Sequence, residues 1–532
     1  MGETTHPDPD STARGPGGDG NDPIARLNSL NSWHSDWSGL RVAVVGLGVT
    51  GFSVADTLAE LGAEVLVVAP ATGTDDRAMI LEVVGVSVVS DPLDSIPAAL
   101  IGFAPELIIV SPGFRPEHPV LVWAGEKQIA VWGDIELAWR VRDKVNPAEW
   151  IVVTGTNGKT TTVRLAAHLL AAHGVRVAPC GNIGVPVLDA VRDPVGFDVF
   201  VVELSSFQLH AMPRHGPGAI HPWSSAVLNI ADDHLDWHGS RAAYRAAKAT
   251  VYENTKVACV YNRADVATVR LVEEADVEEG ARAIGFGLDV PGPSDVGIVD
   301  GILCDRAFLE ERRTSALEVT TVEELAAHGL GAPHTVANVL AATALARSYG
   351  VPVAVIRDAV TTFRLDEHRI QPVAQDGGIR WVDDSKATNP HAAHASLRAC
   401  ESVVWIVGGL LKGVDVDDLV REHVQRLRAA IVIGVDRVAI VEAFRRHAPG
   451  LPLFEVSTRD TENVMSAAVA LAAQVAQPGD TVLLAPAAAS MDQFIDYGDR
   501  GRRFQAAVLR HLGGEANDGS HAPASPDSGG GS

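Results

Sequence analysis

The stretch WIVVTGTNGKTTT, from Trp150 to Thr162, places the tightest restriction on how this chain can fold. Its run of apolar, β-branched residues predicts a buried strand, and the Leu- and Ala-rich segment from Val163 to His173 predicts a helix directly after it. Glycines between a strand and a helix aim several backbone N–H groups at one point, where the helix N-terminus adds positive partial charge. We therefore predict a phosphate-binding loop in an α/β domain.

Two side chains of this loop suit a nucleoside triphosphate. Lys159 would reach the β- and γ-phosphates, and the hydroxyl of Thr160 would ligate Mg²⁺. The general pattern G-x-x-x-x-G-K-[ST] is matched only from Gly158 onward, because Val153 stands at its first glycine and the nearest upstream glycine is Gly155. The loop is thus a shorter variant of the pattern. The alternative is an ordinary strand-to-helix turn with a solvated lysine.

Charge and cysteine usage narrow the class of partner and compartment. With 43 basic and 67 acidic residues the formal net charge is −24, which repels nucleic acid and anionic membrane surfaces unless one face locally reverses it. The four cysteines are scattered without a C-x-x-C pair, which fits neither a disulfide framework nor a zinc site. No run reaches the roughly 18 apolar residues of a membrane helix. We expect a cytoplasmic monomer that binds no nucleic acid and inserts into no membrane.

The length of 532 residues predicts about three domains. Both ends are rich in Gly, Pro, Asp and Ser, which predicts disordered tails without a signal peptide. The predicted organisation is a tail (1–38), a Rossmann-like domain (39–143), a central ATP-binding domain (144–364), a second Rossmann-like domain (365–513) and a final tail (514–532).

The first domain opens with a βαβ pattern from Arg41. The pattern G-x-G-x-x-G from Gly46 to Gly51 follows the first strand directly, as in sites for a dinucleotide or a nucleotide diphosphate. An NAD site also needs an acidic residue at the end of the second strand, and the sequence there, from Ala69 to Ala71, is APA. An NAD dehydrogenase is therefore a poor interpretation.

Acidic residues and histidines follow two predicted strands of the central domain. Glu203 ends an apolar strand that begins at Val199, and a carboxylate beside a phosphate loop suits Mg²⁺. The strand from Ala226 to Ile230 leads into ADDHLDWHG, whose density of carboxylates and imidazoles, His234 among them, indicates metal binding or acid/base chemistry. The alternatives are an exposed strand-end glutamate, a solvated loop, or a zinc site with only two histidines.

Two predicted helices carry polar pairs at i, i+4, so each pair shares one helix face. RAAYRAAKATVYEN contains Tyr244 and Lys248, and PHTVANVLAATALAR contains His334 and Asn338. A surface lysine and a core or capping role for the second pair are the alternatives to ligand binding. The segment 274–319 between these helices is expected to form small strands and loops.

The last module predicts a third parallel sheet. Its four predicted strands begin near Gly378, Val403, Ala430 and Thr481. Positive charges lie among the strand ends, where open α/β sheets bind ligands, and they suit a polyphosphate or a carboxylate substrate. These charges are Arg369, Lys386 and Lys412.

Taken together, these stretches resemble the Mur ligase family of ATP-dependent ligases. The resemblance runs from about Leu40 to Leu512 and rests on GLGVTG, SPG, GDIEL, TGTNGKTT, GNIG, ELSSFQL, NIADDHLDWH, YRAAK, HTVAN, EHR, DDSKATN, GGLLKG and SMDQF, in that order. It implies an α/β fold of three domains: an N-terminal Rossmann-like domain, a central P-loop ATPase-like domain with a mostly parallel sheet, and a C-terminal Rossmann-like domain. The first-domain motifs suit the branch that adds D-glutamate to UDP-N-acetylmuramoyl-L-alanine, through an acyl phosphate, in peptidoglycan precursor synthesis.

The resemblance also implies site residues. Catalytic roles fall to Lys159, His234 and Lys248. ATP is implied to contact Gly155, Thr156, Asn157, Gly158, Lys159, Thr160, Thr161, Asn338, Arg369 and Asp384. Two Mg²⁺ ions are implied at Thr160, Glu203, His234 and Lys248, and in this family a lysine at the position of Lys248 is carbamylated into an oxygen ligand. Substrate contacts are implied for Val49, Thr50 and Ser111 (UDP), Asn182 and His234 (muramoyl group), and His368, Lys386, Thr388, Lys412, Ser490 and Tyr497 (D-glutamate).

The chain also departs from the family pattern. Ala69 and Ala71 stand where many members carry an acidic and a basic residue that contact uridine, Leu410 replaces an acidic residue of some members, and Tyr497 replaces a phenylalanine of some. Two rivals stay open. One is a ligase of the same plan with another amino acid, and the other is a P-loop NTPase switch or motor that needs only Lys159 and Thr160.

Overall fold

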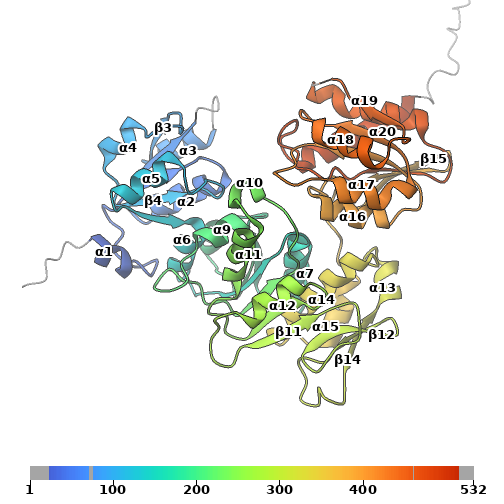
Figure 1. The fold of residues 1–532 in the computed structure, drawn as a ribbon. Helices are drawn as coiled ribbons and strands as arrows, with labels where there is room; N and C mark the ends of the chain where they lie inside the picture. Colours follow the sequence, from blue (N-terminus) through green and yellow to red (C-terminus); the bar gives the residue numbers. More distant parts are fainter. Residues whose placement is uncertain (1–22, 71–75, 459, 515–532) are drawn as a thin grey trace, which may run out of the picture. The chain divides into compact units, whose positions relative to one another are not determined.

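The computed structural model describes residues 23–70, 76–458 and 460–514, which form the predicted α/β fold with three mostly parallel sheets (Figure 1). The chain divides into two compact units. The first extends to Pro147 and includes Val187–Gly196 and Ala211–Ile220, and the second holds the remainder. Of the predicted tails 1–38 and 514–532, residues 1–22 and 515–532 lie outside the described residues. No helix in the described ranges is long and apolar enough to cross a bilayer.

The first unit is built on a parallel sheet in the order β3-β2-β1-β4-β5. Apolar side chains fill both faces of β1 (Arg41–Val45), as the continuous RVAVV run predicts for a central parallel strand. The other strands are β2 (Glu64–Ala69), β3 (Ser87–Ser90), β4 (Leu107–Val110) and β5 (Ala130–Gly133). The helices are α2 (Val49–Glu60), α3 (Asp76–Val83), α4 (Ala98–Phe103), α5 (Pro119–Glu126) and α6 (Asp134–Arg140).

Residues 23–38 correct the prediction of a tail that reaches residue 38. Pro23–Ser29 form helix α1, and Leu30 and Trp37 are each 1 % exposed. Arg140, itself buried, donates from Nη1 to the carbonyl oxygens of Leu27 and Leu30 over 3.2 and 3.0 Å. The polar composition of the N-terminal region hid this segment, because a few large apolar side chains are enough to anchor it.

The first unit also takes in two segments predicted for the central domain. Helix α8 (Val187–Val191) packs against α2 and α6. Ser53 on α2 donates a hydrogen bond to Asp189 over 2.5 Å, and Arg192 pairs with Asp56 and with Glu60. The predicted boundary near residue 144 is therefore crossed again by the chain.

The second unit contains a sheet in the order β14-β13-β12-β11-β10-β9-β6-β8-β7. Its strands are parallel from β7 to β12, whereas β13 and β14 are antiparallel. They are β6 (Glu149–Thr154), β7 (Val177–Gly181), β8 (Val199–Glu203), β9 (Ser224–Val227), β10 (Ala258–Asn262), β11 (Arg282–Phe286), β12 (Asp295–Val299), β13 (Ile302–Asp305) and β14 (Leu317–Thr321). The segment 274–319 thus widens this sheet.

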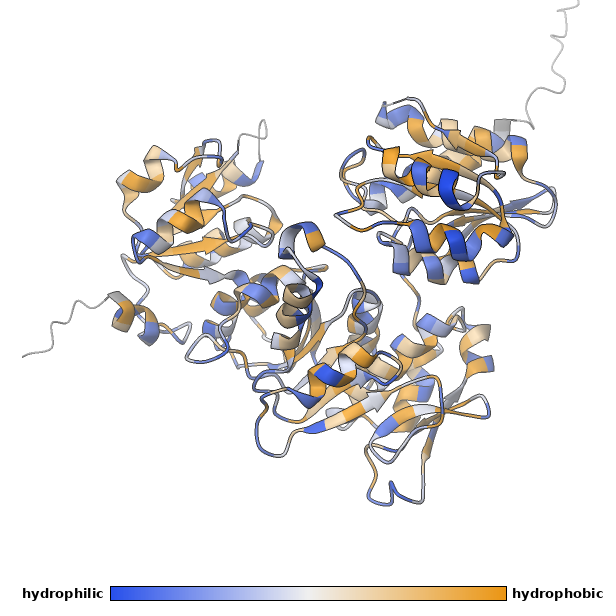
Figure 2. Cartoon of the chain, viewed as in Figure 1, coloured by the Kyte–Doolittle hydropathy of each residue, from blue (hydrophilic) through white to orange (hydrophobic). Residues whose placement is uncertain are grey.

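Helices α7 and α14 pack together in an apolar core that also contains side chains from this sheet. Both helices are rich in Leu and Ala, whose small or flexible side chains allow the helices to approach closely. The hydropathy colouring of Figure 2 shows hydrophobic residues in orange along many of the strands. The helices are α7 (Lys159–Ala172), α9 (Ser206–Ala211), α10 (Leu235–His238), α11 (Arg241–Ala249), α12 (Val266–Glu273), α13 (Val322–Ala327), α14 (Pro333–Ser348) and α15 (Val353–Val360), with a 3₁₀ turn at Thr250–Tyr252.

The second unit ends with a six-stranded sheet in the order β15-β16-β20-β17-β18-β19. Its members are β15 (Gln371–Asp376), β16 (Ile379–Asp383), β17 (Val403–Gly408), β18 (Leu427–Ile433), β19 (Leu453–Glu455) and β20 (Thr481–Leu484). The helices are α16 (Pro390–Arg398), α17 (Asp417–His423), α18 (Val438–His447), α19 (Thr461–Val475) and α20 (Tyr497–Gly514), with a 3₁₀ turn at Val424–Arg426. The four predicted strands are present. The edge strands β15, which is antiparallel to β16, and β19 escaped prediction because each buries little.

Candidate functional site

The loop Gly155–Gly158 joins β6 to α7, as the sequence predicts, and Lys159–Thr161 form the first turn of the helix. Gly155 has φ +149° and Gly158 has φ +84°, and Gly158 is the N-cap of α7. A side chain at Gly158 would collide with Oδ1 of Asn338 on α14. Both positions therefore require glycine because of their backbone conformation. The N-terminus of α7 lies at the loop and favours binding of an anion there.

Lys159 is the first residue of α7, and its side chain turns back onto the loop. Its Nζ donates to the carbonyl oxygens of Gly155 and Thr156 over 2.9 and 3.0 Å. Burial lowers its pKa, while the carboxylates of Glu203 and Asp233 act in the opposite direction. The ammonium is thus held against the backbone of the phosphate loop by two of the loop's own carbonyl oxygens.

Glu203, at the end of β8, is the acceptor for two polar side chains. Thr160 Oγ1 donates to its Oε2 over 2.9 Å, and Asn182 Nδ2 donates to its Oε1 over 3.0 Å. The carboxylate is 2 % exposed, so the alternative of an exposed strand-end glutamate is wrong. A hydroxyl and a carboxylate beside a phosphate loop form the hard-oxygen donor set that Mg²⁺ prefers.

Lys248, on α11, is 2 % exposed, so it is no surface lysine. Its Nζ donates to Thr154 Oγ1 over 3.0 Å and lies 5.1 Å from the ring centroid of Tyr244. Among the described residues no carboxylate lies within ion-pairing distance of this nitrogen. Burial, followed by the charge of Lys159, lowers its pKa well below the usual lysine value. A lysine with a lowered pKa loses its proton more easily and then carries a neutral amine.

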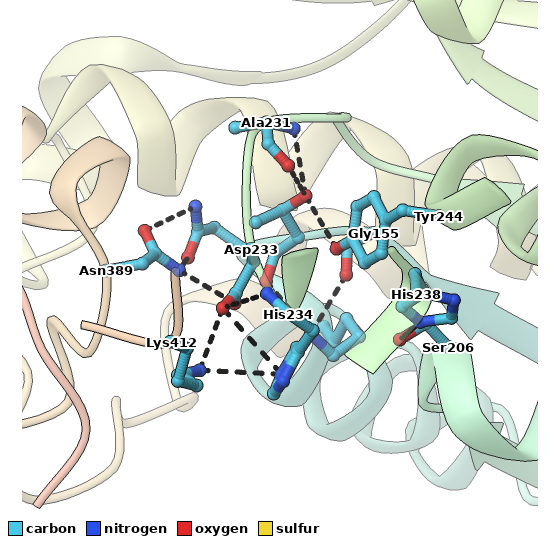
Figure 3. A network of polar contacts seen from close by, with 12 residues as sticks. Gly155, Ser206, Ala231, Asp233, His234, His238, Tyr244, Asn389 and Lys412 are labelled. Carbon is cyan, nitrogen blue, oxygen red and sulfur yellow. Dashed lines mark hydrogen bonds and ion pairs between the residues drawn. The ribbon is translucent and has the colours of Figure 1, made fainter. Parts of the chain in front are cut away.

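Asp233, His234 and Lys412 form the second polar group of the site (Figure 3). Lys412 Nζ donates to Asp233 Oδ1 over 2.8 Å and lies 3.4 Å from His234 Nε2. Burial lowers the pKa of His234 to about 4, so its imidazole is neutral at pH 7. His234 has φ +53°, a conformation that non-glycine residues rarely adopt, and it stacks edge-on against Phe207.

Asn389 connects the loop after β16 to the phosphate loop. Its Nδ2 donates to Asn157 Oδ1 over 2.9 Å, and Asn157 Nδ2 donates back to Asn389 Oδ1 over 3.3 Å. Asn389 also caps α16 through the N–H of Ala392. Loops at the carboxyl ends of strands from both sheets of the second unit therefore contact each other at the phosphate loop, and strand carboxyl ends are where open α/β sheets bind ligands.

A cavity of about 810 Å³ opens between these strand ends. Its size suits a nucleotide-sized ligand. Leu228, Ile230, Val266 and Phe286 give it apolar walls beyond the phosphate loop. The predicted residues that line it are Thr156, Asn157, Gly158, Lys159, Thr160, Thr161, Asn182, Glu203, Asn338, Arg369, Asp384, Lys386, Thr388 and Tyr497.

The cationic wall of this cavity comes from the last module. Nε of Arg369 is buried without a hydrogen-bond partner among the described residues, which is typical of a group that binds an anionic ligand. Burial, followed by Arg369, lowers the pKa of Lys386 to about 7, and its Nζ lies 3.7 Å from the ring centroid of Tyr497. Burial raises the pKa of Asp384 to about 6. Phosphate loop, oxygen donors and facing cations fit a Mg²⁺-bound nucleoside triphosphate.

Several predicted residues lie outside the lining of this cavity. Lys248, His234 and Lys412 belong to the adjoining polar groups described above. Ser490 is buried in the loop between β20 and α20. His368 is buried, and its Nδ1 lies 2.7 Å from Oδ2 of Asp383 at the end of β16, so its position favours support of β16 over contact with a ligand.

The predicted UDP contacts belong to the first unit. Val49 and Thr50 begin α2 after the Gly-rich turn, and Ser111 follows β4, donating from Oγ to the carbonyl oxygen of Gly46 over 3.4 Å. The sheet order reverses between β1 and β4, so these residues stand at its topological switch point. Ala69 is buried at the end of β2, and Ala71 lies outside the described residues.

Sequence reasoning missed Asn389 and gave Asp233 and Asn229 no assigned role. Asn229 Oδ1 accepts from the N–H of Asn157 over 2.8 Å, so it shapes the phosphate loop from the end of β9. Asn229 lies in NIADD, near the end of the strand predicted from Ala226 to Ile230, and Asn389 lies in KATNPH, in the stretch that follows the first predicted strand of the last module. Their position at strand ends was the available signal.

Comparison with known proteins matches two family models. Residues 153–346 match the Mur ligase middle domain, and residues 368–488 match the Mur ligase glutamate ligase domain. The chain is 66 % identical over 513 residues to the UDP-N-acetylmuramoylalanine–D-glutamate ligase of Leifsonia xyli subsp. xyli, covering 95 % of this chain and 99 % of the relative. It is 51 % identical to the Streptomyces coelicolor protein of the same name, covering 90 % and 99 %.

Solved structures share the fold at lower identity. The UDP-N-acetylmuramate–alanine ligase of Thermotoga maritima superposes with a TM-score of 0.53 at 20 % identity, covering 89 % of this chain and 99 % of that one. The MurF ligase of Thermotoga maritima, solved in complex with ADP, has a TM-score of 0.50 at 17 % identity, covering 92 % and 99 %. Sequence match and fold agree: the chain belongs to the Mur ligase family.

Proposed function

We propose that this chain is an ATP-dependent ligase that joins D-glutamate to UDP-N-acetylmuramoyl-L-alanine in peptidoglycan precursor synthesis. The observation that carries the proposal is the cavity in which Lys159 and Thr160 of the phosphate loop face Arg369 and Lys386 of the last module. A switch or motor needs only the loop. Cations on a second sheet are what a carboxylate substrate requires beside the nucleotide. The names of the relatives supply the choice of D-glutamate.

The proposed reaction is an amide formation in two steps. The γ-phosphoryl group of ATP passes to the terminal carboxylate of L-alanine, and the amine of D-glutamate then attacks the acyl phosphate and displaces phosphate. Lys159, held at the loop, stabilises the charge that develops on the transferred oxygens in both steps. Arg369, with its free Nε, is placed to contact the polyphosphate.

Thr160 and Glu203 would hold a first Mg²⁺, and His234 with Lys248 would complete the donors for a second. The ions would supply Lewis-acid stabilisation of phosphoryl oxygens. We propose that Lys248 is carbamylated. A buried lysine with no carboxylate partner among the described residues and a pKa well below its usual value is chemically suited to react with CO₂, and the product offers an oxygen donor.

The amino acid is assigned to the cationic residues of the last module. Lys386, with Thr388 and Tyr497 beside it, would bind one carboxylate of D-glutamate, while Lys412 and Ser490 complete the proposed site. Lys412 already holds an acidic partner, Asp233, over 2.8 Å, which illustrates its capacity for a carboxylate. Val49, Thr50 and Ser111 are proposed to bind the UDP group, and Asn182 with His234 the muramoyl group.

One experiment separates this function from its rivals. ADP release is measured with UDP-N-acetylmuramoyl-L-alanine and, in parallel, D-glutamate, L-glutamate, L-alanine or meso-diaminopimelate. We expect release only with D-glutamate. Release without any amino acid would favour the NTPase switch, and preference for another amino acid would overturn the assignment. We further propose a monomer that acts in the cytoplasm, where its four free, buried cysteines stay reduced.

A further inference from the structure

Arg500, on α20, is fully buried at 0 % exposure and joins two loops of the last module. Its Nε donates to Ser385 Oγ over 3.0 Å and its Nη2 to the carbonyl oxygen of Ser385 over 2.8 Å. Its Nη1 donates to the carbonyl oxygen of Ala488 over 3.1 Å. One guanidinium therefore fixes the loop after β16 to the loop after β20.

The acceptors of Arg500 are all neutral. Arg140, the other buried arginine among the described residues, pairs with Glu136 over 2.8 Å, and the partly buried Arg347 pairs with Asp305 over 2.7 Å. Among the described residues no carboxylate lies within ion-pairing distance of Arg500. Burying a charge without a counter-charge is unfavourable for stability. A hydrophobic residue would fill the position at lower cost, so a role beyond packing is indicated.

The residues that Arg500 holds are next to the proposed amino-acid site. Ser385 directly precedes Lys386, and Ala488 lies two residues before Ser490. Ser385 Oγ also donates to the carbonyl oxygen of Tyr497 over 2.7 Å, which ties the start of α20 to the same point. Three separate stretches that carry proposed D-glutamate contacts thus converge on one side chain.

We propose that Arg500 is the positioning residue of the acidic amino-acid site, holding Lys386, Ser490 and Tyr497 in one arrangement. This inference rests on the proposed function. The planar fork of arginine directs donors to both loops at once, whereas the ammonium of lysine presents a single point of attachment. Because Arg500 acts through the backbone and Ser385, it affects binding of the amino acid and leaves the phosphate loop unchanged.

The test compares Arg500→Lys and Arg500→Met with the control Arg510→Met. Arg510 is an exposed arginine of the same helix, and its side chain donates to Ser466 Oγ over 3.4 Å. For Arg500→Lys we expect KM for D-glutamate to rise at least tenfold, with KM for ATP and for the UDP substrate within about twofold of wild type. Arg500→Met should raise it further, and Arg510→Met should match wild type. A uniform change in all three KM values, or a wild-type KM for D-glutamate in Arg500→Lys, would overturn the proposal.

A second measurement does not depend on the identity of the substrate. Amide hydrogen exchange of the apoenzyme should be faster in Arg500→Lys at residues 384–388 and 487–492, and unchanged at the phosphate loop 155–161. Unchanged exchange in both loops would refute the positioning role even if the enzyme used another amino acid. Conversely, the wild-type enzyme could show no activity with D-glutamate while exchange in these two loops is faster in the variant. That result would contradict the proposed function and support the positioning role of Arg500.

Discussion

Thr160 donates its hydroxyl to Oε2 of Glu203 over 2.9 Å, so the first turn of α7 is tied to the end of β8. The two residues are 43 positions apart in the chain, and their parallel strands bring them to one edge of the sheet. Asn182 occupies the other carboxylate oxygen. Glu203 is therefore preoriented, and replacing it tests the oxygen donor set directly.

Glu203→Gln should lower kcat by a factor on the order of 10²–10³, because the amide removes the negative charge that a Mg²⁺ ligand supplies. The fold should persist, since the amide can still accept from Thr160. The measurement is ADP release as Mg²⁺ is titrated, and we expect a higher Mg²⁺ requirement. The control is Glu149→Gln, a partly exposed strand-end glutamate paired with Lys256, which should match wild type. Equal activity of both variants would remove Glu203 from the metal site.

Lys248→Ala should abolish most activity, and a short-chain carboxylate such as acetate should restore part of it. The alanine leaves room near Thr154 for an added carboxylate that replaces the proposed carbamate oxygen. Lys256→Ala, at a half-exposed ion pair, is the matched control and should neither lose activity nor respond to acetate. Full activity of Lys248→Ala without the additive would exclude the carbamate.

The architecture of the fold was largely predictable from patterns that are local in sequence. Continuous apolar runs such as that of β1 and the strand-glycine-helix signal at Gly158 marked parallel strands and their turns. Segments whose placement depends on distant partners were not predictable. Helix α1 is anchored by Arg140, and α8 joins the first unit through contacts with α2, neither of which leaves a periodic signal.

The site divides in the same way. Lys159, Thr160 and Glu203 were predictable because a phosphate loop and a strand-end carboxylate have their own sequence context. Lys248 reads as a surface lysine from helix periodicity alone, and only the resemblance gave it a role. Asn389 depends on a contact with Asn157 from a different sheet, 232 residues away, which spacing along the chain cannot indicate.

Trp37→Ala should destabilise the first unit by about 3–5 kcal/mol, because an almost fully buried indole leaves a cavity. The ring packs edge-on against Trp132, and its Nε1 donates to the carbonyl oxygen of Ser32 over 3.0 Å. The measurement is the free energy of unfolding by urea, followed by fluorescence. Trp33→Ala, which removes a less buried ring of the same segment, should cost much less. Equal stability of Trp37→Ala and wild type would show that this segment does not contribute to the core of the first unit.

Binding of D-glutamate should weaken as pH rises through about 7. The pKa of Lys386 falls to about 7 because the residue is buried and because Arg369 and Lys159 face it, while Glu203 and Asp496 act in the opposite direction. Below this pH the ammonium attracts a carboxylate, and above it the neutral amine does not. Lys386→Arg keeps its charge at every accessible pH.

The measured quantity is the ratio of KM for D-glutamate in wild type to that in Lys386→Arg, between pH 5.5 and 9. Taking a ratio removes titration of the substrate, which is common to both enzymes. We expect a flat ratio below about pH 6.5 and a rise that approaches tenfold per pH unit above about pH 7.5. The contribution of Lys386 to folding stability should change with pH in the opposite direction to its contribution to binding. The unfolded lysine holds its proton up to about pH 10.4, so the unfolded state binds more protons between pH 7 and 10 and the contribution of Lys386 to stability increases with pH. A ratio that stays flat across the whole range would show that the charge of Lys386 does not bind the amino acid.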